Sequence, residues 1–314
     1  MVPFSVTILG SSSALPTSDR FPTSQVVTLN EKLFLIDCGE GTQIQLRKFG
    51  IKYGRINHIF ISHLHGDHIF GLPGLISTLA LYGRKGELHI HAHSDLKPMM
   101  DGFMKHMQEI TDLKILYHPL NFRRRMTIYQ DDKIEIESFP LKHRIPCCGF
   151  LFKELPAELH LRPDALNEYN VPVYQRQAIK RGADLILEDG TVIPNQQLTK
   201  PSCRPRSYAF CTDTVYKKEL ATLLKDVDLL YHEATFGGDL DDLARKTFHT
   251  TSVQAATMAS KAEAGKLIIG HFSSRYKSVK HLVDEARSIF PETYAANDGD
   301  RFEIPVKEIK IDDL

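Results

Sequence analysis

Four side chains that can bind a metal ion lie within six residues of one another: His63, His65, Asp67 and His68. They follow the apolar run 59–61, whose composition predicts a buried β-strand. Because side chains alternate faces along an extended chain, the first two histidines should point the same way, and Gly66 lets the backbone turn before the other two groups. Neutral imidazole and carboxylate groups are ligands that zinc and similar first-row ions prefer.

A polar loop with scattered histidines is the plain alternative to a metal site at residues 63–68. A His-x-His pair alone is weak evidence for a metal. The longer pattern His-x-His-x-Asp-His at the end of an apolar strand is stronger evidence, because one folded unit can then deliver ligands to two adjacent ions. Two-metal sites hold their ions about 3.5–4 Å apart and suit hydrolysis at phosphorus or carbonyl centres. The pattern therefore predicts a metal-dependent hydrolase.

At this motif the sequence resembles the metallo-β-lactamase superfamily. The resemblance implies an α/β fold class (α+β by some schemes), built as a four-layer αββα sandwich with the metals at one edge of the two sheets. It also implies a role for Asp37, which opens the segment DCGEG at residues 37–41. In the superfamily this position is a buried acid that braces the metal site without binding metal, whereas a helix cap is the alternative for an Asp at a strand end.

The composition bounds the class of protein. The 314 residues are 42% hydrophobic and 25% charged, which is ordinary for a globular chain with a sizeable core. The 39 basic and 39 acidic residues balance, so global charge gives no support for a nucleic-acid partner, although a local basic surface could still neutralise phosphates. Apolar runs shorter than the roughly 18–20 residues of a membrane span predict no membrane segment. The five cysteines fit free thiols in a reducing cytosol better than a disulfide framework, which predicts a cytoplasmic protein.

Hydrophobic patterning predicts the elements that must position these residues. Period-two alternation indicates strands at 6–9, 25–29, 33–36, 87–93, 115–118, 126–129, 134–139, 207–211, 227–231 and 267–270, with short strands near Tyr294 and Phe302. Helical periodicity indicates helices at 42–49, 72–82, 95–110, 217–224, 251–264 and 279–290. The helix at 251–264 should begin at hydroxyl capping residues.

Further metal-capable groups follow other predicted strands. His143 lies between two strands, and Asp213 and His271 each come just after one. A carboxylate at Asp213 could bridge two metals with one oxygen to each. Cys147 and Cys148 could be rival ligands, since thiolates bind zinc well, but a short Cys-Cys pair without a partner pair is more often core packing.

A second histidine pattern occupies the predicted strand 87–93. His89, His91 and His93 share one face of this strand, which could make another metal site. We prefer packing as the interpretation, because nothing nearby in the sequence supplies further ligands and the superfamily has no ligand here.

More narrowly, the sequence resembles the ribonuclease Z family, the endonucleases that trim the 3′ trailer from precursor tRNA. The match runs from about residue 4 to residue 302. It rests on five motifs: DCGEGTQ at 37–43, SHLHGDHIFGLPG at 62–74, HEAT at 232–235, HTT at 249–251 and HFSSRY at 271–276.

The resemblance implies two Zn²⁺ per subunit, with Mn²⁺ as a possible alternative, and a role for each matching residue. His63, His65 and His143 would hold one ion, Asp67, His68 and His271 the other, and Asp213 would bridge them. Asp67 would also orient the nucleophile or take its proton. His249, oriented by Glu233, would protonate the departing ribose oxygen, and a structural ion pair is the alternative for these two residues.

Residues 151–206 are interrupted by prolines and carry only short helical or strand patterns, which predicts an inserted arm in one domain over residues 1–314. The family carries its tRNA-binding exosite at this place. The arm is not strongly basic, since residues 151–200 hold six basic and seven acidic side chains. Five arginine and lysine residues, in the arm and near the site, are candidate substrate contacts: Arg20, Arg176, Lys180, Arg181 and Arg275. The resemblance also implies a homodimer in which one subunit's arm holds the tRNA cut by the other.

Two other functions compete with precursor tRNA cleavage. A phosphodiesterase or arylsulfatase of the same fold, acting on small molecules, would share all the metal ligands. The arm and the Glu233–His249 pair argue against it. A non-enzymatic scaffold with a structural metal is less compatible with ligands at every expected position.

Overall fold

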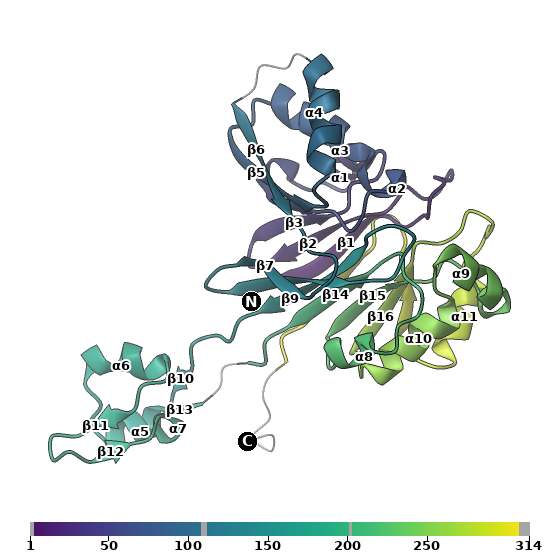
Figure 1. The fold of residues 1–314 in the computed structure, drawn as a ribbon. Helices are drawn as coiled ribbons and strands as arrows, with labels where there is room; N and C mark the ends of the chain where they lie inside the picture. The colour runs from purple at the N-terminus through teal and green to yellow at the C-terminus, as the bar shows by residue number, and fades with distance from the viewer. Residues whose placement is uncertain (1–2, 108–111, 201–202, 308–314) are drawn as a thin grey trace. The chain divides into compact units, whose positions relative to one another are not determined.

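The computed structural model describes residues 3–107, 112–200 and 203–307. The chain separates into two compact units (Figure 1), which are Met1–Lys153 with Ser207–Ile304, and Glu154–Arg206 with the segment that begins at Pro305. The second unit thus begins at Glu154, three residues after the start of the arm predicted at 151–206. The reason is that β9 (Cys148–Glu154) continues through Leu151 and Phe152, whose side chains are buried in the first unit.

The first unit is built on two sheets. Over the described residues the first sheet has seven strands in the order β18-β1-β2-β3-β4-β5-β6. Strands β3 to β6 run parallel, and the remaining pairs are antiparallel. The strands are β1 (Phe4–Gly10), β2 (Ser24–Leu29), β3 (Lys32–Ile36), β4 (Ile56–Phe60), β5 (Gly86–Ala92), β6 (Leu113–Pro119) and β18 (Arg301–Glu303).

The second sheet also has seven strands within the described part of the chain, in the order β17-β16-β15-β14-β9-β8-β7. Strands β14 to β17 run parallel, and β9 joins β14 in antiparallel fashion. Besides β9, the strands are β7 (Met126–Gln130), β8 (Ile134–Pro140), β14 (Ser207–Cys211), β15 (Leu229–Glu233), β16 (Lys266–Gly270) and β17 (Thr293–Ala295). Both sheets therefore have a parallel half, and loops at the carboxyl ends of those strands can form a site.

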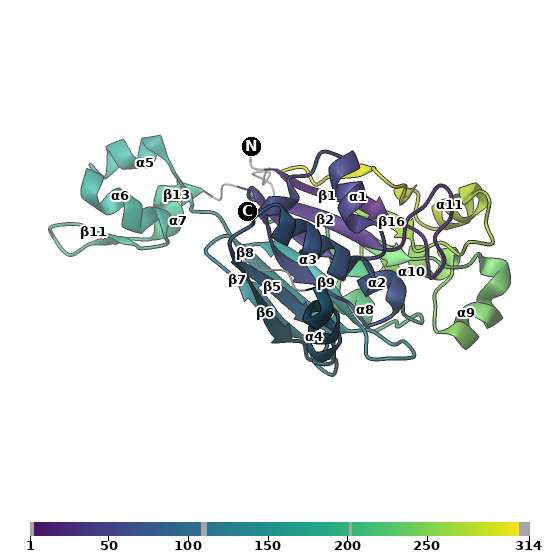
Figure 2. The same ribbon diagram turned by 90° about the horizontal axis from the view of Figure 1, so that it is seen from above.

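Helices cover the outer face of each sheet (Figures 1 and 2). On the first sheet lie α1 (Thr42–Lys48), α3 (Gly71–Leu81) and α4 (Leu96–Met107), and on the second α8 (Leu220–Leu223), α10 (Ser252–Lys261) and α11 (Lys280–Arg287). Shorter helices lie in the loops: η1 (Tyr53–Arg55), α2 (Gly66–Ile69), η2 (Gly238–Leu240) and α9 (Asp241–Thr247). The order of layers is helix, sheet, sheet, helix.

The core between the two sheets is aromatic. Phe34 and Phe60 of the first sheet pack against Phe152 of the second, with ring centroids 5.8 Å apart and edge-to-face geometry in both cases. Each fully buried side chain of this size contributes about 1.5–3 kcal/mol relative to exposure. This packing fixes one sheet on the other and therefore fixes the loops at their shared edge.

The helices differ in part from those the sequence predicts. Helix α10 starts as predicted, with a reciprocal capping box between Thr251 and Gln254. The helix predicted at 217–224 is reduced to α8, and α9 was not predicted because only Ala244 of its side chains is buried. The last residues of the helix predicted at 95–110 lie outside the described residues.

The second unit has a small core of its own. Its elements are β10 (His160–Leu161), α5 (Pro163–Glu168), α6 (Val173–Lys180), β11 (Leu185–Ile186), β12 (Val192–Ile193), α7 (Asn195–Leu198) and β13 (Thr199–Lys200). Its buried apolar side chains come from all parts of the segment: Ala165, Val171, Ile179, Leu185, Ile193 and Leu198. Because prolines interrupt the hydrophobic periodicity of this segment, the sequence does not indicate this core.

Candidate active site

The sequence-predicted metal ligands meet where strands of both sheets end. Residues 63–68 follow β4, Asp213 follows β14, and His271 comes directly after β16. His143 lies in the loop between β8 and β9. Strand ends held by a packed core give side chains a fixed direction, which a metal site needs.

Three residues at this edge have left-handed backbones, which residues with a β-carbon rarely adopt. The φ angles are 54° at Asp37, 38° at Asp213 and 58° at His271. Such conformations cost on the order of 1–3 kcal/mol each and cluster at functional sites. The strain occurs where the chain leaves a strand and turns a side chain into the site.

A first group of four donor atoms surrounds one point: those of His63, His65, His143 and Asp213, all within 4.8 Å of one another. Nδ1 of His65 lies 3.0 Å from Nε2 of His63 and 3.2 Å from Nε2 of His143. Both Nε2 atoms lie 3.6 Å from Oδ2 of Asp213. The two histidines of β4's carboxyl end thus converge with groups from the second sheet.

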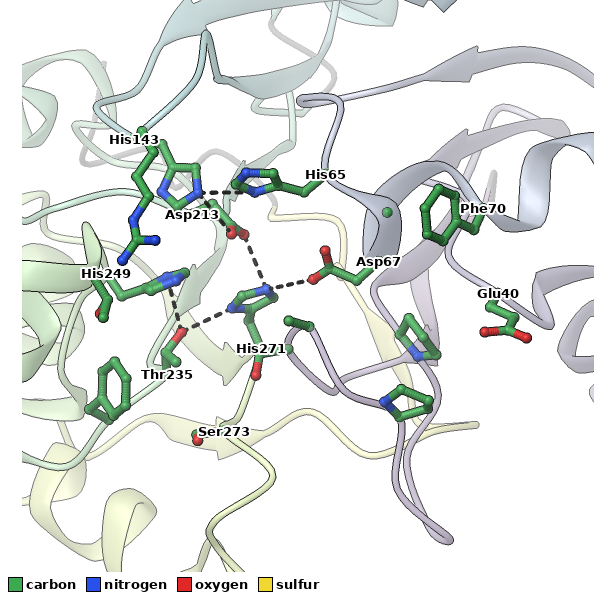
Figure 3. Close-up of a pocket in the computed structure, with 18 residues that line it drawn as sticks. Glu40, His65, Asp67, Phe70, His143, Asp213, Thr235, His249, His271 and Ser273 are labelled. Atoms are coloured by element: carbon green, nitrogen blue, oxygen red, sulfur yellow. Dashed lines mark hydrogen bonds and ion pairs between the residues drawn. The ribbon is translucent and has the colours of Figure 1, made fainter. Parts of the chain in front are cut away.

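A second group uses the other oxygen of Asp213. Nε2 of His68 lies 3.3 Å from both Oδ2 of Asp67 and Oδ1 of Asp213. Nε2 of His271 lies 3.4 Å and 3.2 Å from the same two oxygens. Asp213 therefore presents one oxygen to each group of donors (Figure 3).

These donors fit a pair of metal ions. Tetrahedral bonds of the 2.0–2.1 Å typical of zinc separate neighbouring ligands by about 3.3–3.4 Å. The donor–donor distances of 3.0 to 3.6 Å in the two groups bracket this value. Moreover, Nε2 of His68 and Nε2 of His271 are buried and have no hydrogen-bond partner among the described residues. A metal ion would use these lone pairs.

The outer nitrogen of four of these imidazoles is held by a neighbour. In His63, Nδ1 lies 3.0 Å from Ser62 Oγ, and in His68 it lies 2.7 Å from Asp37 Oδ2. In His143, Nδ1 lies 3.0 Å from the Phe248 carbonyl, and in His271 it lies 2.9 Å from Thr235 Oγ1. Asp37 also accepts the amide and hydroxyl of Ser62, at 2.7 and 2.9 Å. An Nδ1 that donates its hydrogen leaves the lone pair on Nε2, as a metal ligand requires.

The electrostatics of the site also favour cations. Asp37, Asp67 and Asp213 place three carboxylates in it, and the partners in their ion pairs among the described residues are histidines. Burial opposes ionisation of Asp213, but His271 and His68 outweigh burial and hold the pKa of this carboxyl well below its usual range. The buried negative charge would be neutralised by divalent ions.

Glu233, which is buried, and His249, which is partly buried, form a pair beside the donor groups. Nδ1 of His249 lies 3.0 Å from Oε1 of Glu233, which also accepts the amide of Thr214. Thr235 donates its hydroxyl to Oε2 of Glu233 at 2.6 Å. Burial disfavours the charged imidazole, but Glu233 outweighs burial and raises the pKa of His249 to about 9. His249 can also group with Asp213 and His271 as a metal ligand by distance, so it borders the metal positions.

A cavity of about 610 Å³ opens over the donor groups. Figure 3 shows His143 and His249 on one side of Asp67, and Phe70 and Glu40 on the other. The cavity is large enough for a nucleotide and leaves the donors accessible.

The cysteine pair lies outside both donor groups. Cys147 and Cys148 are buried in the apolar cores, and burial raises the pKa of each thiol well above its usual value. Core packing, the preferred interpretation, matches this placement.

The two arginines predicted near the substrate have different surroundings. Arg20 turns inward and donates to Ser11 Oγ at 2.7 Å, to the Ala296 carbonyl at 2.6 Å and to Asn297 Oδ1 at 3.0 Å. Arg275 is exposed, and its guanidinium lies 4.9 Å over the ring of Phe236 at the cavity. Arg20 therefore braces its loop, whereas Arg275 remains available to a ligand.

Three basic residues of the second unit, called the arm cations here, lie on or next to α6: Arg176, Lys180 and Arg181. Arg176 donates to the carbonyl of Val171 at 3.3 Å. Arg181 is exposed and pairs with Glu158 at 3.0 Å. Their role in substrate binding stays a prediction.

The histidines of strand β5 belong to a stack rather than to a metal group. His89 and His91 stack with His58 of β4 and His118 of β6, through ring centroids 4.6 to 5.5 Å apart. Nδ1 of His58 lies 3.2 Å from Nε2 of His91. His93 is outside the stack and contacts Phe122. Within the described residues no set of three donors from this histidine stack meets the distances of a metal site.

Four residues of the site were not singled out by sequence reasoning: Ser62, Thr235, Phe248 and Phe70. Thr235 lies in the motif HEAT and Ser62 directly before His63, so the motifs contained them without indicating their contacts. Phe248 contributes a backbone carbonyl, which no side-chain pattern can indicate.

Comparison with known proteins identifies the family. Ribonuclease Z of Bacteroides thetaiotaomicron is 48% identical over 299 residues, which cover 95% of this chain and 95% of the relative. The chain belongs to the ribonuclease Z family. It is therefore an enzyme that hydrolyses phosphodiester bonds in RNA, and the predicted function, tRNA 3′ processing by an endoribonuclease, is confirmed at the level of the family. Residues 4–199 also match the model of a family described as "Anti-Pycsar protein Apyc1", so the chain belongs to that family too.

Solved structures have the same fold. The short form of human tRNase Z matches with a TM-score of 0.70 and 27% identity, over 96% of this chain and 99% of that one. A metallo-beta-lactamase fold protein from Bacillus subtilis matches with a TM-score of 0.66 and 18% identity, again over 96% of this chain and 99% of that one. The predicted fold is thus confirmed. Among the described residues, no helix has both the length and the apolar character needed to cross a membrane.

Proposed function

We propose that the site binds two zinc ions and cuts precursor tRNA before its 3′ trailer, leaving a 3′-hydroxyl on the tRNA and a 5′-phosphate on the trailer. The division of Asp213 between two groups of donors carries this proposal. The ligands of one ion would be His63, His65 and His143, those of the other Asp67, His68 and His271, with Asp213 shared. The same donors would also accept Mn²⁺.

When bound, the metal pair supplies Lewis-acid activation of water and neutralises charge that develops on the phosphate. Around it, the residues of this chain have distinct roles. Asp67 orients the attacking water and accepts its proton. Asp37 holds Nδ1 of His68 at 2.7 Å and thereby fixes the direction of Nε2.

His249 acts on the leaving group. The water oxygen bonds to phosphorus, the bond from phosphorus to the ribose 3′-oxygen breaks, and that oxygen takes a proton from the imidazole of His249. Glu233 holds Nδ1 of His249 and so directs the other ring nitrogen toward the cavity. A positioned acid of this kind contributes typically 10²- to 10⁴-fold to the rate.

A sulfur substitution in the substrate tests the acid. We expect His249→Ala to slow cleavage of a 3′-extended precursor tRNA by about 10²- to 10⁴-fold. A precursor with sulfur in place of the scissile 3′-oxygen needs no such proton, because a thiol has a pKa of only about 8.5. On that substrate His249→Ala should lose little. An equal loss on both substrates would refute the acid role and indicate a structural pair.

The cleavage itself is tested with precursors that do or do not encode CCA. Wild type should make a single cut near the discriminator base, the last nucleotide before the CCA position, and Asp67→Ala should make none. Failure of the zinc-loaded wild type to cut any precursor would refute tRNA as the substrate. A small-molecule phosphodiesterase would then be the better assignment.

The arm and the dimer belong to the same proposal. The arm cations would contact the tRNA backbone, Arg275 would contact the RNA near the cut, and Arg20 would keep its loop in place. In a homodimer, the arm of one subunit would hold the tRNA cut by the other. Mixing a subunit in which the arm cations are reversed to Glu with an Asp67→Ala subunit should then restore cleavage that neither has alone. No restoration in a proven mixed dimer would refute action between subunits.

The proposed location is the cytoplasm. The cysteines are free thiols, and four of the five are buried. This state fits a reducing compartment, where precursor tRNA is also found. Fluorescence of a tagged full-length chain outside the cytoplasm would contradict it.

A further inference from the structure

An exposed aromatic ring stands at the edge of the cavity, and the mechanism above does not use it. Phe70 follows α2 directly and comes three residues after Asp67. It lines the cavity, and 63% of its surface is exposed. Because removing apolar surface from water is favourable, a ligand that covers this ring would gain binding energy from it.

The ring of Phe70 is held in place by a glycine. A β-carbon at Gly66 would lie only 2.3 Å from Cε2 and 2.6 Å from Cζ of Phe70, so the ring rests against the bare backbone of Gly66. The amide of Phe70 donates to the Gly66 carbonyl at 2.9 Å. One face of the ring is therefore supported, and the orientation is set before any ligand arrives.

The other phenylalanine of the cavity does not offer a free face. Phe236 is 4% exposed, and the guanidinium of Arg275 lies 4.9 Å over its ring. His249 approaches the same ring in edge-to-face geometry at 6.1 Å. Of the two phenylalanines, Phe70 is the one able to accept a flat ligand.

The surroundings of Phe70 suit a base better than a phosphate. Figure 3 shows it beside Glu40, on the side of Asp67 away from His143 and His249. A carboxylate repels a phosphate, whereas a nucleobase can stack on the phenyl face.

We propose that Phe70 stacks against the base of the first trailer nucleotide, the one directly 3′ of the cut. This inference rests on the proposed function, in which His249 protonates the 3′-oxygen on the tRNA side. Phe70 lies across Asp67 from His249, so the nucleotide it reaches is on the trailer side of the phosphate. Stacking would hold the first trailer nucleotide while the phosphate is attacked.

A cycle of protein and substrate changes tests the stacking. The proteins are wild type, Phe70→Leu, which keeps an apolar side chain without a ring face, and Phe70→Tyr, which keeps the face. Phe103→Leu is the matched control, because Phe103 is also exposed but lies on α4 outside the cavity. The substrates are an unmodified precursor tRNA, one with an abasic first trailer nucleotide and one with an abasic discriminator nucleotide.

We expect Phe70→Leu to lower kcat/KM on the unmodified precursor by about 5- to 150-fold, the range measured for single base–aromatic stacks. Phe70→Tyr and Phe103→Leu should stay near wild type. On the precursor abasic at the first trailer nucleotide, wild type should lose the same factor, and Phe70→Leu should lose nothing more. The abasic discriminator should leave the ratio of wild type to Phe70→Leu unchanged.

Losses that multiply independently for Phe70→Leu and the abasic trailer nucleotide would overturn the proposal, as would coupling to the discriminator nucleotide alone. A change of oligomeric state in Phe70→Leu without any coupling would make the ring a protein contact and also overturn it. Metal content and the thermal midpoint of each variant identify misfolding. If Phe70→Leu is unstable, wild type on the two abasic precursors keeps the test valid, because only the abasic trailer nucleotide should lower its kcat/KM by the stacking factor. Failure of wild type to cut the unmodified precursor would refute the proposed function instead.

Discussion

Acidification should weaken the first unit through the stack of His58, His89, His91 and His118. His91 is 4% exposed, and its Nδ1 has no hydrogen-bond partner among the described residues. Burial, reinforced by His118 and His58, lowers the pKa of His91 from 6.5 to about 3. The groups facing the stack from other strands are Tyr129, 4.7 Å from His58, and the Lys32–Asp131 pair.

The sign and size of the effect follow from the two pKa values of His91. Below about pH 6.5 the imidazole of His91 binds a proton in the unfolded chain, whereas in the folded chain it stays neutral down to about pH 3. The contribution of His91 to the free energy of unfolding is therefore fully present above pH 6.5 and decreases as the pH is lowered. Each pH unit in that window removes about 1.4 kcal/mol, which gives about 2 kcal/mol at pH 5 from His91 alone. His58, whose pKa burial lowers to about 4, adds a smaller loss because it is partly exposed.

The assay is urea unfolding of wild type and His91→Phe between pH 8 and pH 5. Phenylalanine keeps the packing against Phe60, whose ring centroid lies 4.6 Å from that of His91, but cannot take up a proton. At pH 8 the variant should be less stable by about 1 kcal/mol, since Nδ1 of His58 then has no ring nitrogen opposite it. By pH 5 the difference should have shifted by about 2 kcal/mol in favour of the variant. Because the other titratable groups are the same in both proteins, the difference isolates His91. A gap that does not depend on pH would refute this reasoning.

Three further predictions concern the site and the arm. Asp37→Asn, which tolerates the left-handed backbone, should weaken metal binding by about 10- to 100-fold by loosening His68, and competition with a chelator measures this. Thr235→Val should remove the hydroxyl that donates to Oε2 of Glu233 and lies 2.9 Å from Nδ1 of His271, and so lower the free energy of unfolding by about 1–3 kcal/mol. An unchanged urea midpoint would contradict that role of the hydroxyl. Reversing the arm cations to Glu should weaken precursor binding and make it less dependent on salt. The slope of the logarithm of the binding constant against the logarithm of salt concentration should decrease in size by roughly 0.7–0.9 for each phosphate that the arm no longer neutralises. An unchanged slope would exclude the arm cations from the interface.

The elements and candidate ligands were accessible from the sequence because their signals are local. The alternation around Ile59 predicts a strand, and a strand that ends in His63 and His65 places both imidazoles on one face. The same reasoning found Asp213 and His271 at the ends of apolar runs. The family motifs then supplied roles for these residues that spacing alone does not determine.

The arrangement of those residues around two centres depends on the tertiary structure. Asp213 serves both groups only because packing of one sheet on the other brings β4, β14 and β16 to a common edge. Arg20 faces inward because Ala296, remote in the chain, lies beside its loop and offers a carbonyl.

The histidine stack shows most clearly the difference between what local sequence patterns predict and what the tertiary structure determines. Alternation in β5 shows that His89 and His91 share a face, but the partners come from other strands. The pairing of His58 with His89 and of His91 with His118 is set by strand register, which packing of whole sheets decides. The sequence by itself determined which residues could carry chemistry, because that depends on side-chain type and local period. The tertiary structure decided which of them meet, because contacts between distant segments depend on how the sheets pack.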